Sequence, residues 1–140
     1  MMNIVDQLRR DEGESPTCYQ DHLGYWTIGV GRLIDAKKGG GLRPDEIAYL
    51  LNNDIQDRRE ALDKALPYYK TLSPQRQGVL INMAFNMGVA GLLKFKQLLA
   101  AVEAKHWGIA AKEMLDSNWA RQVPKRAVRL ALQMETNLWQ

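Results

Sequence analysis

The stretch "RRDEGESPTCYQDHLGYWTIGVGRL", residues 9–33, changes its predicted secondary structure twice. The apolar residues that lead into it recur with helical spacing, and Glu12 precedes a glycine of the kind that ends helices. After that glycine the sequence alternates, turns at Asp-His-Leu-Gly and becomes aromatic and β-branched. We therefore expect a helix over residues 3–12 and a small antiparallel sheet with tight turns over residues 17–34.

The remainder of the chain predicts mainly helices. Residues 35–41 contain three consecutive glycines and predict a flexible loop, because glycine is costly to order. Apolar spacing and Ser, Pro and Gly boundary signals predict helices over residues 44–66, 73–88, 91–104, 106–115 and 124–136, and a short helix that opens at Ser117 or Asn118. The expected fold class is α+β, with a small antiparallel β-sheet lobe joined by the long helix to a larger helical lobe, and a cleft between them.

Length and composition fit a single domain with two lobes over residues 1–140. We expect a β-rich lobe at about 14–43 and a helical lobe at about 67–140, the latter joined by the N-terminal helix 3–12. No run of 18 apolar residues occurs, so no membrane span is expected, and the charged N-terminus does not resemble a signal peptide. Cys18 is the single cysteine; we expect it to be a packed small side chain without a disulfide partner.

The net charge of +3 is unevenly distributed along the chain. Residues 1–70 hold 10 Lys/Arg and 12 Asp/Glu, a net charge of −2, and residues 71–140 hold 9 and 4, a net charge of +5. The segment "RQVPKRAVR", residues 121–129, has four basic residues and no acid. This suits an anionic partner such as nucleic acid, a membrane surface or the bacterial cell wall, but a solvated helix face explains it equally well.

The two carboxyl groups of the opening stretch suggest acid–base chemistry. Glu12 ends a helix, where the negative end of the helix dipole and a desolvating cleft wall favour its protonated form. Asp21 lies in a turn and is expected to stay solvated and ionised, and the Thr27 hydroxyl is placed to hold a water between itself and Asp21. Glycoside hydrolysis needs such a pair, with one group protonated and the other ionised. Acids before a helix stop and in turns are also common structural features, so this pattern alone leaves the function open.

The segments "LRRDEG" and "YQDHLGYWTIGVGRL" resemble the phage-type lysozymes, the endolysin family (glycoside hydrolase family 24) represented by T-even phage lysozyme. The family pattern is Glu, eight residues, an acid or Cys, five residues, Thr, and it matches Glu12, Asp21 and Thr27. The segments "LINMAFNMG" and "SNWARQVPKRA" are similar to helices of that family, so the resemblance covers nearly the full length. It implies a lysozyme-like fold.

The resemblance also implies the chemistry. Glu12 is the implied general acid, Asp21 activates the attacking water and Thr27 positions it. The implied reaction is a single displacement with inversion that cleaves the β-1,4 bond between N-acetylmuramic acid and N-acetylglucosamine in bacterial peptidoglycan. Leu33 and Phe85 match implied substrate-binding positions.

Three supporting residues follow from the same resemblance. Arg126 matches the arginine implied to pair with the catalytic acid. That pairing would favour the ionised form of Glu12, whereas the helix dipole and desolvation favour its protonated form. The sequence leaves that balance open. Trp119 and Gln122 match residues that pack behind the acid, and we expect their role to be structural.

The chain departs from the family pattern at several positions. The loop of residues 35–43 is short and lacks the extra helix of longer members, so saccharide contacts differ there. Arg32 stands where the T-even enzyme has a histidine that pairs with a distant aspartate, and we do not expect the same salt bridge. Leu98 and Glu113 occupy positions where polar contacts to substrate are expected.

We expect no cofactor and no metal, because His22 and His106 lack partners at metal-binding spacing. The expected partner is bacterial peptidoglycan, with no nucleic acid, no membrane span and a monomeric chain. The resemblance implies that the protein stays in the host cytoplasm until a holin permeabilises the membrane, and then acts on the periplasmic cell wall.

Three alternatives stay open: a basic helical nucleic-acid-binding module that uses residues 121–129, a lytic transglycosylase on the same fold, and an inactive lysozyme-like protein.

Overall fold

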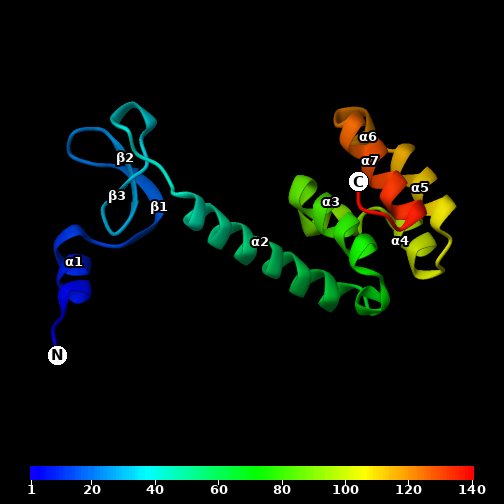
Figure 1. Cartoon of the computed structure of the whole chain (residues 1–140), viewed down its shortest axis with the longest axis horizontal. Helices are drawn as coiled ribbons and strands as arrows, with labels where there is room; N and C mark the ends of the chain where they lie inside the picture. The colour runs from blue at the N-terminus through cyan, green and yellow to red at the C-terminus, as the bar shows by residue number, and fades with distance from the viewer. The chain divides into compact units, whose positions relative to one another are not determined.

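The computed structural model describes all 140 residues and has a mixed architecture of seven α-helices and one three-stranded antiparallel sheet. The helices are α1 (Ile4–Glu12), α2 (Pro44–Ala65), α3 (Pro74–Leu93), α4 (Lys96–Glu103), α5 (Trp107–Leu115), α6 (Asn118–Gln122) and α7 (Pro124–Thr136), and the strands are β1 (Ser15–Gln20), β2 (Trp26–Gly29) and β3 (Arg32–Leu33) (Figure 1). The expected α+β, lysozyme-like fold class is confirmed. The chain forms two compact units, Met1–Leu51 and Asn52–Gln140, and α2 runs from the first into the second.

Helix α1 is short and closed at both ends by local signals. The Asn3 side chain accepts hydrogen bonds from the backbone of Val5 and Asp6, and the Asp6 side chain accepts one from the Asn3 backbone, which completes a capping box. Gly13, at φ 77°, ends the helix in a conformation that disfavours a side chain. These two signals place Glu12 at the last helical position, as predicted.

The sheet has the strand order β1-β2-β3. Thr27 is the central residue, because it pairs with Tyr19 on β1 and with Leu33 on β3. The pairing of β1 with β2 shifts register between Ser15 and Tyr19, and the side chains of β1 are mostly exposed. Cys18 is therefore exposed, and the expectation that it is packed was wrong: β1 is an edge strand with one face to solvent.

Residues 35–41 are more ordered than the run of glycines predicts. Ala36–Lys38 form a 3₁₀ turn, because the Asp35 carboxylate accepts hydrogen bonds from the backbone of Lys37 at 2.9 Å and of Trp26 at 3.2 Å. Gly40 packs so closely that a Cβ there would lie 2.7 Å from the carbonyl oxygen of Leu33. The glycines thus let the loop fold back onto β3.

The hydrophobic core belongs to the second unit. Buried apolar side chains run from Leu62 on α2 to Met134 on α7, and α3 contributes Val79, Leu80, Met83 and Ala84 from its centre. Helix α3 is thus largely buried, and α7 packs against α3, α5 and α6. In contrast, the apolar residues Ile47, Leu50 and Leu51 in the first half of α2 are exposed.

The region between α3 and α4 differs from the prediction in its boundaries. Helix α3 continues to Leu93 across a kink at Gly88, which has φ 78° and ψ 158°, so the predicted stop at Gly88 is a bend. A new helix begins at Lys96 and not at residue 91. No single helix has the length and hydropathy of a membrane span; α3 and α4 reach them only when taken together, and they are bent by 98° at their junction.

Candidate active site

Glu12 lies against the turn between β2 and β3. A Cβ added at Gly31 would lie 2.9 Å from Glu12 Oε2. Gly31 has φ 64°, so both the backbone conformation and the close carboxyl favour glycine. The end of α1 and the "TIGVG" turn therefore bring the proposed acid to the sheet, and the Glu12 side chain is otherwise exposed to solvent.

Asp21 caps the turn between β1 and β2. Its Oδ1 atom accepts hydrogen bonds from the backbone N–H groups of Leu23 and Tyr25, each at 2.9 Å. The Tyr25 hydrogen bond is the main cause that lowers the pKa of Asp21 from its ordinary value of 3.8, with smaller help from Leu23 and the adjacent His22 and opposition from partial burial. Asp21 is therefore ionised at neutral pH.

Thr27 joins the same hydrogen-bonded turn from β2. Its hydroxyl donates to the carbonyl oxygen of Tyr25 at 3.0 Å, and the backbone N–H of Asp21 donates to the same oxygen at 2.9 Å. Thr27 is 4% exposed, so its rotamer is fixed by packing as well as by this bond. Because the hydroxyl proton is used on Tyr25, the Thr27 oxygen is left as an acceptor toward a water.

Leu33 lies beside Thr27 in the sheet and lines a surface hollow of about 500 Å³. The hollow runs past Gly31 and the loop glycines Gly39–Gly41. It therefore extends from Gly31, which contacts the Glu12 carboxyl, to the loop of residues 35–43.

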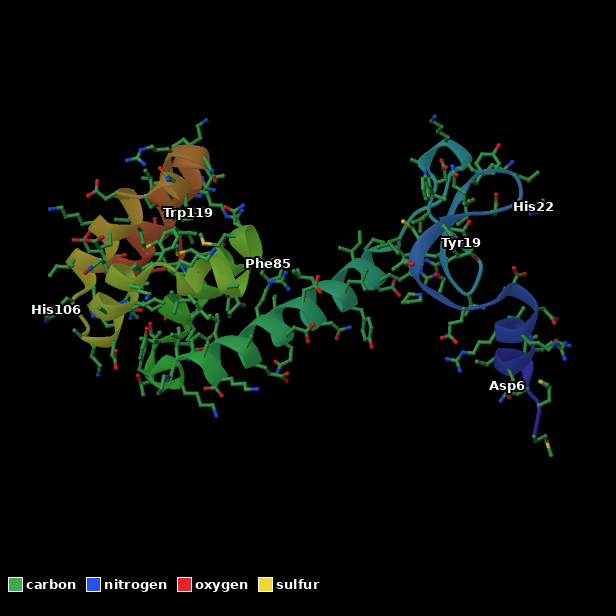
Figure 2. All side chains as sticks on the ribbon, turned by 180° about the vertical axis from the view of Figure 1, so that it is seen from behind. Asp6, Tyr19, His22, Phe85, His106 and Trp119 are labelled. Atoms are coloured by element: carbon green, nitrogen blue, oxygen red, sulfur yellow. The ribbon has the colours of Figure 1, made fainter.

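The remaining predicted residues lie in the second unit, where α3 carries polar side chains on an otherwise apolar helix. Trp119 is buried, and its Nε1–H donates to Asn86 Oδ1 at 2.7 Å (Figure 2 marks Trp119 on α6). Arg126 donates from Nε to Asn82 Oδ1 at 2.8 Å and from Nη2 to the Asn82 carbonyl at 3.2 Å. Trp119 and Arg126 are thus each held by one asparagine of α3.

Phe85 is half-buried on α3 between these asparagines in sequence (Figure 2). The guanidinium of Arg58, on α2, stacks over the Phe85 ring with its Cζ 4.1 Å from the ring centroid. One face of the ring is therefore covered, and a saccharide would contact the remaining face or the ring edge.

A second hollow, of about 490 Å³, lies beside Trp119. It is lined by Asn86, Gln122, Leu98 and Glu113 among others. Leu98 and Glu113 were expected from the sequence near substrate and Gln122 behind the acid, and the structure places all three along this hollow. Asn82 and Asn86 were missed; their signal is two amide side chains, four residues apart, on an apolar helix.

The histidines and possible metal ligands add no further residues to the candidate site. His22 is exposed at the tip of the β1–β2 turn, beyond the labelled Tyr19 of β1 (Figure 2), which agrees with a solvated turn histidine. No three His, Cys, Asp or Glu side chains lie together as metal ligands. Of the residues predicted from the sequence, Glu12, Asp21, Thr27 and Leu33 thus lie in the first unit. Phe85, Arg126, Trp119 and Gln122 lie in the second unit.

Comparison with known proteins defines the class. Residues 9–132 match the family model of phage lysozyme. The chain is 33% identical to a probable T4-type lysozyme 1 and 30% identical to a probable T4-type lysozyme 2, both of Dictyostelium discoideum, with 96% of this chain and 94% of each relative covered. It is also 32% identical to the pre-baseplate central spike protein Gp5 of Enterobacteria phage T4, over 94% of this chain and 27% of that protein.

These likenesses cover nearly the whole chain, and they agree with the mixed fold described above. The fold and the matches define a lysozyme-type glycoside hydrolase whose substrate is peptidoglycan. Within that class, the chain belongs to the phage lysozyme family.

Proposed function

We propose that this protein hydrolyses the β-1,4 bond between N-acetylmuramic acid and N-acetylglucosamine of bacterial peptidoglycan, with inversion at the anomeric carbon. The observation that carries the proposal is the arrangement of one short sheet. Its β2–β3 turn contacts the Glu12 carboxyl through Gly31, and its β1–β2 turn holds an ionised Asp21 hydrogen-bonded to Tyr25, which also accepts from Thr27.

In the proposed reaction Glu12 gives its proton to the glycosidic oxygen as the bond from the anomeric carbon to that oxygen breaks. The departing oxygen keeps the bond's electron pair. A water held at Thr27 attacks the anomeric carbon from the opposite face and passes its proton to Asp21. Inverting enzymes need room for this water, roughly 6.5–9.5 Å between the two carboxyl groups.

The backbone hydrogen bonds to Asp21 support its part in this scheme. A carboxylate held by two N–H groups stays ionised and keeps its orientation, and its second oxygen, Oδ2, has no hydrogen bond within the protein. Oδ2 is thus available to accept the proton of the attacking water.

The test replaces each group in turn. We expect Glu12→Gln and Asp21→Asn to slow the clearing of permeabilised Gram-negative cells by at least about 100-fold, because each loses a proton transfer in the transition state. Glu14→Gln is the matched control, since Glu14 is an exposed neighbouring acid paired with Arg9 at 3.6 Å, and it should clear cells at the wild-type rate. Equal clearing by wild type and Glu12→Gln would reject the acid assignment.

The end product separates hydrolysis from transglycosylase chemistry, in which the sugar's own hydroxyl attacks and no water is used. Asp21 and Thr27 favour hydrolysis, because an acceptor pair of this kind serves to hold a water. Mass analysis of released muropeptides should show reducing muramic acid ends. Anhydro ends would overturn the hydrolytic mechanism and leave the class of the enzyme unchanged.

The supporting roles of Arg126, Trp119 and Gln122, and saccharide contacts at Leu33 and Phe85, stay predictions. By likeness to endolysins, we propose further that the protein acts as a monomer, waits in the host cytoplasm, and reaches the periplasmic cell wall after a holin has permeabilised the membrane, with host cell lysis as the outcome.

A further inference from the structure

Arg32 forms an ion pair with Glu46, which lies at the start of α2. Its Nη2 atom is 2.6 Å from Glu46 Oε2, and the side chains are 38% and 23% exposed. This is the shortest ion pair of the molecule and the least exposed one.

Glu46 is itself held in place by a second hydrogen bond. Its other oxygen, Oε1, accepts from the backbone N–H of Arg43 at 2.8 Å, which caps the first turn of α2. The Arg43 guanidinium lies 3.9 Å from the same oxygen but bonds mainly to Asp45. One carboxyl oxygen of Glu46 thus accepts a hydrogen bond at the start of α2, and the other forms the ion pair with Arg32.

Arg32 connects this fixed point to the proposed acid. It is the first residue of β3, pairs with Ile28 across the turn, and directly follows Gly31, the residue that the Glu12 carboxyl touches. On its other side it precedes Leu33, beside Thr27 in the sheet. A shift of Arg32 would therefore move the backbone that Glu12 rests on.

We propose that the Arg32–Glu46 ion pair is a positioning device for catalysis: it anchors the β2–β3 turn to α2 and so fixes where the Glu12 carboxyl lies. This inference rests on the proposed function in treating Glu12 as the acid. It assigns Arg32 and Glu46 a positioning role, since neither donates the proton nor activates the water.

Two single variants test the pair. Arg32→Gln and Glu46→Gln should each lower kcat about tenfold on soluble peptidoglycan fragments, because a displaced acid loses its near-attack geometry. KM should change little. Glu46→Gln keeps an amide oxygen to cap α2, so its effect reports the lost charge and not a lost cap. Arg32→Lys, which keeps the charge, should recover part of the rate.

The matched control is Arg43→Gln, which removes the other cation near Glu46 without touching the turn. It should leave kcat at the wild-type value. In the double variant Arg32→Gln/Glu46→Gln the loss should be no larger than in either single variant, because the two residues act as one unit. Additive losses, or an equal loss in Arg43→Gln, would overturn the proposal.

A second readout separates this inference from the proposed function. The ¹³C chemical shift of the Glu12 carboxyl carbon should move in Arg32→Gln and Glu46→Gln and stay in place in Arg43→Gln, whether or not the protein is active. If all variants hydrolyse poorly while the shift is unchanged, the pair merely stabilises the fold and the positioning role is wrong. If the shift moves but Glu12→Gln remains active, the acid assignment fails and the coupling of the pair to Glu12 stands.

Discussion

At the scale of single residues, the site depends on how closely a backbone can approach a carboxyl group. The position of Gly31 requires a positive φ and no Cβ beside the Glu12 carboxyl, and glycine satisfies both requirements. Thr27 and Asp21 are fixed differently, by hydrogen bonds to the peptide groups of the same turn. The sheet thus orients Asp21 and Thr27 by hydrogen bonds and Glu12 by its contact with Gly31.

Gly31→Ala tests the contact. A methyl group at this position would lie 2.9 Å from Glu12 Oε2 on a backbone with φ 64°, so either the acid moves or the turn does. We expect kcat to fall by about 10- to 100-fold, measured as release of soluble fragments. Gly88→Ala is the control, because Gly88 also has a positive φ, 78°, has open space around its Cβ and lies on α3, outside the turns of the sheet. A comparable loss in both variants would show that backbone strain, and not the contact with Glu12, is the cause.

The ion pair at Glu46 gives a pH dependence of stability. Arg32 is the largest cause that lowers the pKa of Glu46 from 4.5 to about 2. A lowered folded-state pKa stabilises the protein above the unfolded value, and that contribution is lost as the pH falls from about 4.5 through about 2. Thermal melts of wild type and Glu46→Gln should differ by a constant amount above pH 5 and converge at low pH. A gap that grows on acidification would contradict this assignment.

At the scale of elements, α3 organises the helical unit through two amide side chains. Asn86 holds Trp119 of α6, and Asn82 holds Arg126 of α7. Both asparagines therefore tie neighbouring helices to α3, in addition to the hydrogen bond that Arg76 of α3 donates to the Met134 carbonyl of α7. These hydrogen bonds set the rotation of α6 and α7, where apolar packing alone would tolerate several.

Trp119→Phe removes the hydrogen bond to Asn86 and keeps an aromatic ring in the core. We expect a loss of about 0.5–1.5 kcal/mol in the free energy of unfolding, because the hydrogen bond is lost while the exposed Asn86 side chain bonds to water in its place. Urea unfolding of Trp119→Phe, Asn86→Ala and the double variant measures the coupling. If the two single effects simply add, the bond contributes nothing beyond packing.

At the scale of the whole molecule, the buried core and the proposed acid–base pair lie in different parts of the chain. All buried apolar side chains belong to residues 62–134, whereas Glu12, Asp21 and Thr27 lie within the first 27 residues. Substitutions of Glu12, Asp21 or Thr27 therefore leave the hydrophobic core untouched.

The proposed dependence on a holin is a prediction for the whole protein in its cell. Expression of the chain alone should leave Gram-negative cells intact, and lysis should follow when the inner membrane is permeabilised. Optical density before and after chloroform treatment measures this, with Glu12→Gln as the inactive control. Spontaneous lysis by the wild-type chain would mean that it crosses the membrane by another route.

The sequence alone predicts most of the elements, for local reasons. The glycine after Glu12, the Ser and Pro before α3 and the apolar spacing of the helices are signals within one or two turns of chain, and they place the helices correctly. It misplaces the boundary near Gly88, because packing carries α3 through a residue that usually ends a helix. Family membership then confirms the enzyme class that the motif of Glu12, Asp21 and Thr27 indicates.

Only the tertiary structure decides which residues act on one another. Arg32 and Glu46 are 14 positions apart, and neither carries a sequence signal that names the other as its partner. The same holds for Asn86 and Trp119, and for Gly31 and Glu12, whose contacts depend on how strands and helices fold back in space. Local propensity fixes the elements because it acts along the chain, and the site needed the structure because its geometry comes from contacts between residues that the chain keeps apart.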